Sequence, residues 1–439
     1  MSQRGFSAHS LVGVSVCAGI LFLSAINAHA QTEKTIYSFC SAAHCSDGSF
    51  SNGVAFDAAS GNVFGVAYYG GNKNGCGVTP RTCNGVVYEF TPSTSSYSVL
   101  YKFCKQPGCS DGENPYHVRL VVDSAGNLYG TTEYGGNRSN GGVVFELSPG
   151  QKGWKEKVLY TFCSQFHCKD GFNVQSGLTY AGESSGQPYD GVSPLYGTTL
   201  YGGAYKSGTV FSLTPKTGTK KWAERVLYSF CAQSDCVDGM WPAAVPAIDE
   251  RGNLFGTTIF GGQFGSGAVF ELVSNGDSYF ENVAYSFCAE ANCTDGEEPS
   301  GGVTVDASGN LFGTTEEGGS SNYGVLFELT AGSLWQYNVL TNFDITNGAN
   351  PSGPPTLDGS GGVYGTTAGF TDGIGATVFD FNGTLQTLYT FCAGKGCPDG
   401  SFPNSNLVLD NSGNIIGTTQ TGARRNSGTL FMVSPAAKR

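Results

Sequence analysis

Charged residues are scarce in this sequence. Only 13% of its 439 residues are Asp, Glu, Lys or Arg, and the formal net charge is −12. A nucleic-acid-binding protein needs a basic face, so this balance excludes nucleic acid as a partner. The sequence also has no sustained helical period of apolar residues and no HExxH, phosphate-loop or dinucleotide motif. We therefore expect no cofactor and no resident metal, and no motif assigns a reaction.

What the sequence has instead is a repeat. A unit such as Gly126–Leu147, GNLYGTTEYGGNRSNGGVVFEL, occurs seven times. Each copy has an apolar pair, a Gly-Thr-Thr triplet or a variant of it, a glycine-rich break and a second apolar run. The glycine of the triplet is found, copy by copy, at Gly65, Gly130, Gly197, Gly256, Gly313, Gly365 and Gly417. A period of this length is typical of repeat architectures, in which one unit cannot bury its own faces.

A second block separates the copies. It consists of an aromatic strand, a cysteine pair and Asp-Gly, as in Val99–Gly112. A short apolar segment follows and ends in Asp-x-x-Gly-Asn, as in Leu120–Asn127, and these turn residues indicate a hairpin. One repeat therefore contains four short strands, here called a to d. Seven such repeats predict an all-β fold, a seven-bladed β-propeller of four-stranded blades.

The two ends of the repeat array predict how the ring closes. The first strand, Thr35–Phe39, has the pattern of a d strand, whereas the last, Thr429–Val433, has that of a c strand. The seventh blade thus lacks a d strand of its own. We expect the N-terminal strand to close this last blade, because it would cover an otherwise open sheet edge.

Residues 1–30 have the pattern of a secretory signal peptide, with Arg4, an apolar core at Leu11–Ile26 and a small-x-small site at Ala28–Ala30. The alternatives are a retained membrane helix, for which the apolar run is short, and a lipoprotein modified at Cys17, which lies in the middle of that run. We expect cleavage after residue 30, one propeller domain at residues 31–439, and no stable membrane insertion afterwards. The predicted location is extracellular or periplasmic.

Fourteen of the fifteen cysteines lie beyond the predicted signal. Twelve form six CxxxxC pairs: Cys40 and Cys45, Cys104 and Cys109, Cys163 and Cys168, Cys231 and Cys236, Cys288 and Cys293, and Cys392 and Cys397. Cys76 and Cys83 lie between strands b and c of the first blade, and the sixth block, Phe343–Gly348, has no cysteine. An even count in an exported chain indicates disulfides. Zinc is the alternative, but the spacing and the lack of matching His pairs speak against it.

In its Gly-Asn-Leu-Tyr-Gly-Thr-Thr and Gly-Gly…Gly-x-Val-Phe-Glu-Leu elements, the chain resembles the GloVer tandem-repeat family of exported bacterial proteins. The resemblance covers nearly all of the chain after residue 30. It implies a secreted repeat protein, often surface-anchored, with no established activity. This chain differs from that pattern because its C-terminus, AAKR, shows no anchor, so we expect a released or periplasmic protein. The strand pattern is also similar to that of NHL-type propellers, which mostly bind other molecules.

Two faces of the predicted propeller differ in their loops. The d–a and b–c connections share one face, called here the cysteine-loop face, and the a–b and c–d turns share the other. The loops of the cysteine-loop face vary most among copies, and binding residues tend to lie on loops held by a rigid scaffold. The other face has short a–b turns except in blade 3, where Ala181–Ser193 is longer. We predict binding on the cysteine-loop face.

Repeated acidic residues lie on the same face. The acids of the Asp-Gly pairs are Asp47, Asp111, Asp170, Asp238, Asp295 and Asp399. A ring of carboxylates could bind calcium. The favoured interpretation is that each Asp instead caps its own turn by accepting hydrogen bonds from nearby backbone N–H groups.

An aromatic series precedes the Gly-Gly break. It comprises Tyr69, Tyr134, Tyr201 and Phe260, with Glu317 in the fifth copy. Such rings are candidates for stacking on sugars or gripping a peptide, and the favoured alternative is packing between blades. Glu133 and Glu316 stand one residue earlier. They are a candidate carboxylate pair for glycoside chemistry, although three blades separate them.

His117 and Arg119 break the repeat of the inner strand. At the position of Arg119 the other copies have Gly53, Gly177, Val245, Gly302 and Asn406. Alternation along a strand predicts that His117 and Arg119 point to one side, at the mouth of the channel. There they would bind an anion or act as acid and base, so they are the candidate catalytic residues. An ion pair with acidic loops, or simple channel filling, is the alternative.

These observations favour a secreted, monomeric propeller that binds carbohydrate or protein on the cysteine-loop face. The first alternative is an extracellular lyase or glycoside hydrolase that uses the channel mouth, in which case the protein is an enzyme. The second is a structural envelope component without a small-molecule site.

Overall fold

A computed structural model describes residues 33–71, 84–219, 221–276, 278–370 and 373–434. By its internal contacts the chain divides into two units, Met1–Ala30 and Gln31–Arg439, and all described residues belong to the second. The predicted signal peptide, Cys17, Cys76 and Cys83 lie outside the described residues. Within the described ranges, no helix is long and apolar enough to cross a membrane.

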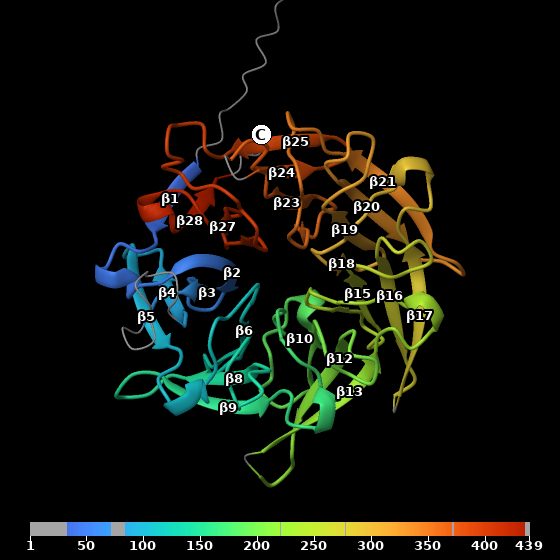
Figure 1. The fold of residues 1–439 in the computed structure, drawn as a ribbon. Coiled ribbons are helices and arrows are strands. Elements are labelled where there is room, and N and C mark those ends of the chain that lie inside the picture. The colour runs from blue at the N-terminus through green and yellow to red at the C-terminus, as the bar shows by residue number, and fades with distance from the viewer. Residues whose placement is uncertain (1–32, 72–83, 220, 277, 371–372, 435–439) are drawn as a thin grey trace, which may run out of the picture. The chain divides into compact units, whose positions relative to one another are not determined.

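The second unit is a seven-bladed β-propeller, as predicted (Figure 1). Seven antiparallel four-stranded sheets are arranged in a ring, with the a strands innermost. Blades 1 to 3 consist of β2(Ser49–Asp57), β3(Asn62–Tyr69), β4(Val86–Thr91) and β5(Ser96–Lys102); β6(Val121–Val122), β7(Leu128–Thr132), β8(Val143–Ser148) and β9(Lys155–Thr161); and β10(Thr179–Tyr180), β11(Leu195–Thr199), β12(Thr209–Pro215) and β13(Trp222–Ser229).

The remaining blades have the same order. Blades 4 to 6 consist of β14(Ala247–Ile248), β15(Leu254–Thr258), β16(Ala268–Ser274) and β17(Tyr279–Ser286); β18(Val303–Val305), β19(Leu311–Thr315), β20(Val325–Thr330) and β21(Gln336–Asn342); and β22(Thr356–Leu357), β23(Val363–Thr367), β24(Thr377–Phe381) and β25(Leu385–Thr390). Blade 7 consists of β26(Val408–Leu409), β27(Ile415–Thr419), β28(Thr429–Val433) and β1(Glu33–Ser38). The helical elements among the described residues are short 3-10 turns in the loops.

The N-terminal strand closes blade 7, which confirms that prediction. Strand β1 pairs antiparallel with β28, with Thr35 opposite Phe431. A second contact joins blade 7 to blade 1: the side chain of Asn406 accepts a hydrogen bond from the N–H of Val54 and donates one to its carbonyl oxygen. The ring is thus closed by segments from both ends of the chain.

The glycine of each Gly-Thr-Thr triplet lies opposite an aromatic residue of strand c. In blade 2 the register pairs Gly130 with Phe145, and a Cβ atom added to Gly130 would come within 2.7 Å of the Phe145 ring. The same pairing occurs in the other six blades: Gly65–Tyr88, Gly197–Phe211, Gly256–Phe270, Gly313–Phe327, Gly365–Phe379 and Gly417–Phe431. The missing side chain leaves the space in which the ring lies, which explains why this glycine recurs.

Each of these rings also contacts the preceding blade. The Phe that ends strand d of one blade packs against the strand c ring of the next, with ring centroids 4.8–5.3 Å apart. The seven pairs are Phe39–Tyr88, Phe103–Phe145, Phe162–Phe211, Phe230–Phe270, Phe287–Phe327, Phe343–Phe379 and Phe391–Phe431. All of these side chains are buried. At least one aromatic pair therefore crosses every seam between blades, and the seam between blades 4 and 5 has further contacts through Tyr337.

The cysteine loops and the Gly-Gly breaks contact each other on one face, as predicted. In blade 2 the N–H of Gly136 donates to the carbonyl of Cys109, and a Cβ on Gly135 would come within 2.6 Å of the Gly112 Cα. These loops therefore form one continuous layer over the cysteine-loop end of each blade.

The predicted disulfides are present in all six CxxxxC pairs, each of which closes its own loop. The bonds join Cys40 to Cys45, Cys104 to Cys109, Cys163 to Cys168, Cys231 to Cys236, Cys288 to Cys293, and Cys392 to Cys397. The zinc alternative is therefore wrong for these twelve cysteines. The disulfide expected of Cys76 and Cys83 stays a prediction, because both lie outside the described residues.

We expect Phe287→Ala to lower the free energy of unfolding by about 3–5 kcal/mol, because it removes a fully buried ring from a seam between blades. The measurement is denaturant unfolding of the purified protein followed by tryptophan fluorescence. Leu334→Ala is the matched control, since Leu334 is 76% exposed. Equal, small effects of the two substitutions would contradict the proposed role of the seam.

Candidate functional site

The inner strands surround a cavity of about 940 Å³ along the propeller channel. Every blade contributes to its wall. The lining extends from His117 and Ser300, at the cysteine-loop end of the inner strands, to the a–b turns at the other end. Most wall residues are small, and one reason is close backbone contact: a Cβ on Gly301 would come within 2.8 Å of the Gly353 carbonyl oxygen.

Arg119 lines this cavity and forms an ion pair. Its Nη2 lies 2.6 Å from Oε1 of Glu183, a residue of the longer a–b turn of blade 3. Thr179 donates a hydrogen bond of 2.5 Å to the other carboxylate oxygen of Glu183. Arg119 thus forms an ion pair, but with the a–b turn of blade 3 on the other face and not with the acidic loops of the cysteine-loop face.

His117 also lines the cavity, but its backbone differs from the prediction. It has a left-handed φ of 49° and precedes strand β6, so simple strand alternation does not apply to it. Its ring stacks on Tyr116 at 4.0 Å between centroids, and its Nε2 lies 3.4 Å from Nε2 of Gln420. Burial lowers the pKa of His117 to about 4, so the imidazole is neutral at pH 7.

Glu133 is a buried carboxylate with three side-chain donors. It accepts hydrogen bonds from Tyr68 at 2.8 Å, Asn173 at 3.1 Å and Gln175 at 2.8 Å. These donors come from blade 1 and from the connection into blade 3. Glu133 therefore holds three neighbouring segments together at the cysteine-loop end of the channel.

Glu316 lies at the same end of the channel. It accepts a hydrogen bond from the hydroxyl of Ser300, and burial, followed by the nearby Glu298 and Glu317, raises its pKa. The pKa of Tyr116 is raised to about 12, first by burial and then by the charges of Glu133 and Glu316. Three blades separate the two glutamates, and their hydrogen-bond partners are different residues.

The aromatic series is half-buried. Tyr69 contacts Phe50 at 5.5 Å, and Trp241 contacts both Tyr201 at 5.6 Å and Phe260 at 5.3 Å. Trp241 belongs to the connection into blade 4, so Tyr201 of blade 3 does pack between blades, which was the favoured interpretation. Tyr134 is likewise half-buried, beside Glu133. A binding role for these rings stays a prediction.

One ring of residues was missed by sequence reasoning. Two residues after the glycine of each Asp-Gly, or Asn-Gly in blade 6, the backbone is left-handed at a residue other than glycine: Phe50, Asn114, Asn173, Trp241, Glu298, Asn350 and Phe402. In blade 4 the N–H of Trp241 donates to Ser207 of the preceding blade, and its carbonyl accepts from Ile259 of its own blade. The backbone role repeats while the side chain varies. A proline after this residue in five of the blades is the sequence signal.

Exposed aromatic side chains lie in the neighbouring b–c loops and were also missed. Tyr205 is 52% exposed and Phe264 is 47% exposed. They follow Tyr201 and Phe260 by four residues, just beyond the Gly-Gly breaks of blades 3 and 4. We call Tyr201, Tyr205, Trp241, Phe260 and Phe264 the aromatic rim.

The Asp-Gly carboxylates are engaged in internal hydrogen bonds, as the favoured interpretation held. Asp111 accepts from the Tyr101 hydroxyl at 2.8 Å and from the N–H groups of Lys105 and Gln106. The other five accept from the equivalent tyrosine and from a backbone N–H. They brace the cysteine loops.

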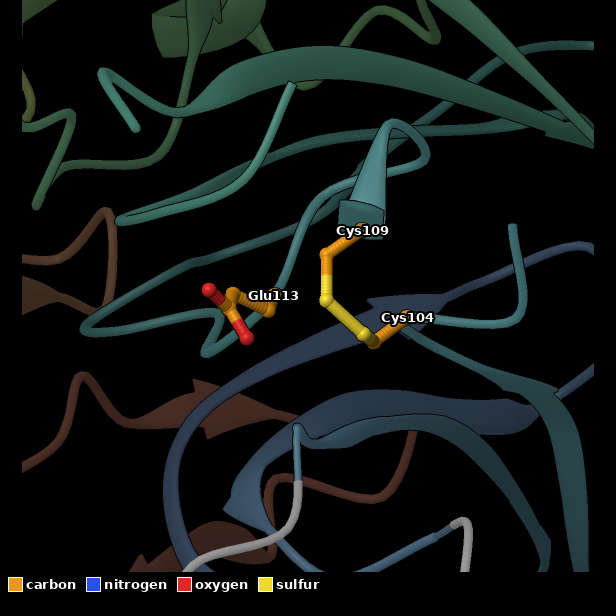
Figure 2. A group of neighbouring side chains, drawn as sticks. All are labelled: Cys104, Cys109 and Glu113. Atoms are coloured by element: carbon orange, nitrogen blue, oxygen red, sulfur yellow. A yellow bond between two sulfur atoms is a disulfide. The ribbon is translucent and has the colours of Figure 1, made fainter. Parts of the chain in front are cut away.

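Two clusters of side chains contain atom types that can bind a metal, but their cysteines are joined in disulfides. Figure 2 shows Glu113 beside the Cys104–Cys109 disulfide, and Glu297 stands equally near Cys288–Cys293. A metal binds the thiolate form of cysteine. The disulfides therefore leave one carboxylate in each group, which is too few ligands for a metal.

A serine motif was also overlooked in the sequence. Gly182–Gly186, GESSG, matches G-x-S-x-G around Ser184. A nucleophile elbow needs a sharp strand-to-helix turn. Ser184 instead lies in a three-residue 3-10 turn, η5(Glu183–Ser185), within the a–b turn of blade 3, so this match does not identify a nucleophile.

These features define a disulfide-braced seven-bladed β-propeller with a polar channel. A family model described as the Gloeobacter/Verrucomicrobia repeat matches residues 10–193 and 181–379. The chain belongs to this family, which confirms the resemblance predicted from the repeat. No curated protein matches the sequence.

One solved structure with a TM-score above 0.5 shares the fold, and two others are similar at lower scores. A puromycin hydrolase is 9% identical with a TM-score of 0.52, and covers 85% of this chain and 51% of its own. A puromycin-hydrolyzing peptidase from Mycobacterium tuberculosis is 10% identical (TM-score 0.47; 84% and 49% covered). A candidate 6-phosphogluconolactonase from Bacteroides uniformis is 15% identical (0.48; 84% and 94%). The chain spans about half the length of the first two, and identities this low show the fold alone.

Carboxyl groups with shifted pKa values also occur away from the channel. Burial, followed by the charge of a neighbouring Asp, raises the pKa of Glu156, Glu224 and Glu281 to about 7. These glutamates occupy equivalent positions in β9, β13 and β17, and Oε1 of each is buried without a described hydrogen-bond partner. Each therefore favours the neutral form in the folded protein.

We expect these three glutamates to make the protein less stable as the pH rises. Their folded pKa exceeds the unfolded one, so the folded state binds more protons, and their stabilisation is lost between about pH 4.5 and pH 7. In the triple variant Glu156→Gln, Glu224→Gln, Glu281→Gln, the melting temperature should fall less between about pH 5 and pH 8 than in the wild type.

The control for this comparison is Glu250→Gln, since Glu250 is exposed in an a–b turn. Parallel melting curves for wild type and triple variant across the pH range would contradict the assignment of raised pKa values.

Proposed function

We propose that the protein is an extracytoplasmic recognition module that binds neutral carbohydrate on its cysteine-loop face. The observation that carries the proposal is the aromatic rim, where Tyr205 and Phe264 are about half exposed in the b–c loops of blades 3 and 4, and Trp241 packs against Tyr201 and Phe260. A sugar ring has apolar C–H faces that stack on aromatic side chains, and a rigid scaffold holds such side chains at low entropic cost.

Polar groups and charge narrow the ligand class. At the end of the channel on the same face, Asn173 and Gln175 donate hydrogen bonds to Glu133, and Oδ1 of Asn173 has no described hydrogen-bond partner. Sugar hydroxyls both donate and accept, so they match such groups. The net charge of −12 disfavours acidic polysaccharides. Neutral glycans are therefore favoured over uronate polymers and over acidic protein partners.

The disulfides support a location outside the cytoplasm. Six of them are present among the described residues, and disulfides persist in oxidising compartments. Together with the signal-like residues 1–30, this favours export of the protein.

We expect Tyr205→Ala and Phe264→Ala each to weaken binding of a neutral glycan by roughly tenfold, which corresponds to about 1.4 kcal/mol. The measurement is a polysaccharide binding array on the protein lacking residues 1–30, followed by titration calorimetry on each hit. Phe280→Ala is the matched control, since Phe280 is 61% exposed on strand β17. An array without any hit would favour the structural-component alternative.

A glycoside hydrolase is the second candidate, because Glu133 and Glu316 occupy equivalent positions at the cysteine-loop end of the channel but have different hydrogen-bond partners. Two carboxyl groups in different environments are what acid and base roles require. If the protein is an enzyme, turnover of chromogenic glycosides should fall by about a hundredfold or more in Glu316→Gln, whereas Phe264→Ala should mainly raise KM. Binding without product in the same wells would exclude this candidate for the glycans tested.

A further inference from the structure

The central cavity has the size and wall chemistry of a small-ligand site. Its volume of about 940 Å³ lies within the range of about 300–1,000 Å³ that is typical of ligand pockets. The wall is formed mainly by Ala, Gly, Ser, Pro and Val residues, and a few polar side chains interrupt it. This site lies along the inner strands, whereas the aromatic rim lies on the b–c loops and on the connection into blade 4.

Two features that the other repeats lack contact each other at this wall. Arg119 occupies the position of a glycine in blades 1, 3 and 5, so the fold does not require an arginine there. Blade 3 has the only long a–b turn in the sequence, and that turn supplies Glu183 as the partner of Arg119. The two departures come from different blades, yet they place a guanidinium and a carboxylate 2.6 Å apart at the cavity.

Unused hydrogen-bonding capacity lies along the same wall. Asn52 is 2% exposed and Ser352 is 7% exposed, and both line the cavity. Neither Oδ1 of Asn52 nor Oγ of Ser352 has a hydrogen-bond partner among the described residues. Buried polar groups are normally satisfied, but these two atoms are shielded from the channel as well as from solvent, so they add no recognition group to the wall.

The charges of the wall select against an anion. Arg119 is already paired with Glu183, His117 is neutral at pH 7 because burial lowers its pKa to about 4, and Asp57 and Asp306 add negative charge. A neutral ligand avoids this field. An Arg–Glu pair offers donors and an acceptor side by side, which suits vicinal hydroxyl groups.

We propose that the central channel is a second binding site, separate from the aromatic rim, for a small neutral polyhydroxylated molecule such as a mono- or disaccharide, and that the Arg119–Glu183 pair holds two of its hydroxyl groups.

The test uses the protein lacking residues 1–30 and a panel of free monosaccharides, disaccharides and myo-inositol. Saturation-transfer NMR identifies binders, and calorimetry measures their affinity. We expect at least one probe to bind saturably, Arg119→Gly to weaken it at least about tenfold, and Phe264→Ala to leave it unchanged. Arg119→Gly restores the residue that three other blades carry, so we expect it to fold. Its melting temperature is the check, and Glu183→Gln replaces it if folding fails.

Two results would overturn the proposal. One is the absence of saturable binding by any probe. The other is a bound probe that is lost with Phe264→Ala but not with Arg119→Gly, which would assign it to the aromatic rim. A third result separates the two proposals. If no polysaccharide binds but a small probe binds and is weakened by Arg119→Gly, the proposed function is rejected and the channel site is supported.

Discussion

A glycine facing an aromatic ring is the contact on which the propeller depends. In every blade the triplet glycine lies opposite the strand c ring, as Gly313 does opposite Phe327. The same ring packs against the last aromatic residue of the preceding blade, here Phe287. One aromatic ring thus packs against the glycine of its own sheet and against the preceding blade. Blade 6 keeps Phe343 although its connection has no cysteines, so the seam needs the aromatic pair and not the disulfide.

Because backbone contacts and this aromatic pair hold the ring, loop side chains are free to differ between blades. The left-handed residue of each connection shows this most clearly, since its N–H and carbonyl bind the same two neighbours whether the side chain is that of Trp241 or Asn173. Side chains that the fold does not require are the ones in which recognition can be sought. A comparison of equivalent positions in the seven repeats therefore shows which side chains the fold does not require.

The fold was predictable from the sequence because its signals are local. Turn residues, strand patterns and the missing d strand of blade 7 each lie within a few consecutive residues. The site was not, because it joins distant positions: Arg119 pairs with Glu183 without any sequence pattern that links the two. The alternation rule failed at His117 because a left-handed backbone precedes the strand there.

The stability of the folded propeller does not explain why Arg119 is present. Placing a partly buried guanidinium in a channel wall costs desolvation, and an ion pair regains that cost only in part. Blades 1, 3 and 5 pack their inner strands with glycine at this position. Blade 3 adds a long turn that supplies Glu183, and the hydroxyl of Thr179 in β10 holds that carboxylate. A feature that costs free energy and needs a second departure from the repeat to support it is better explained by a ligand than by folding.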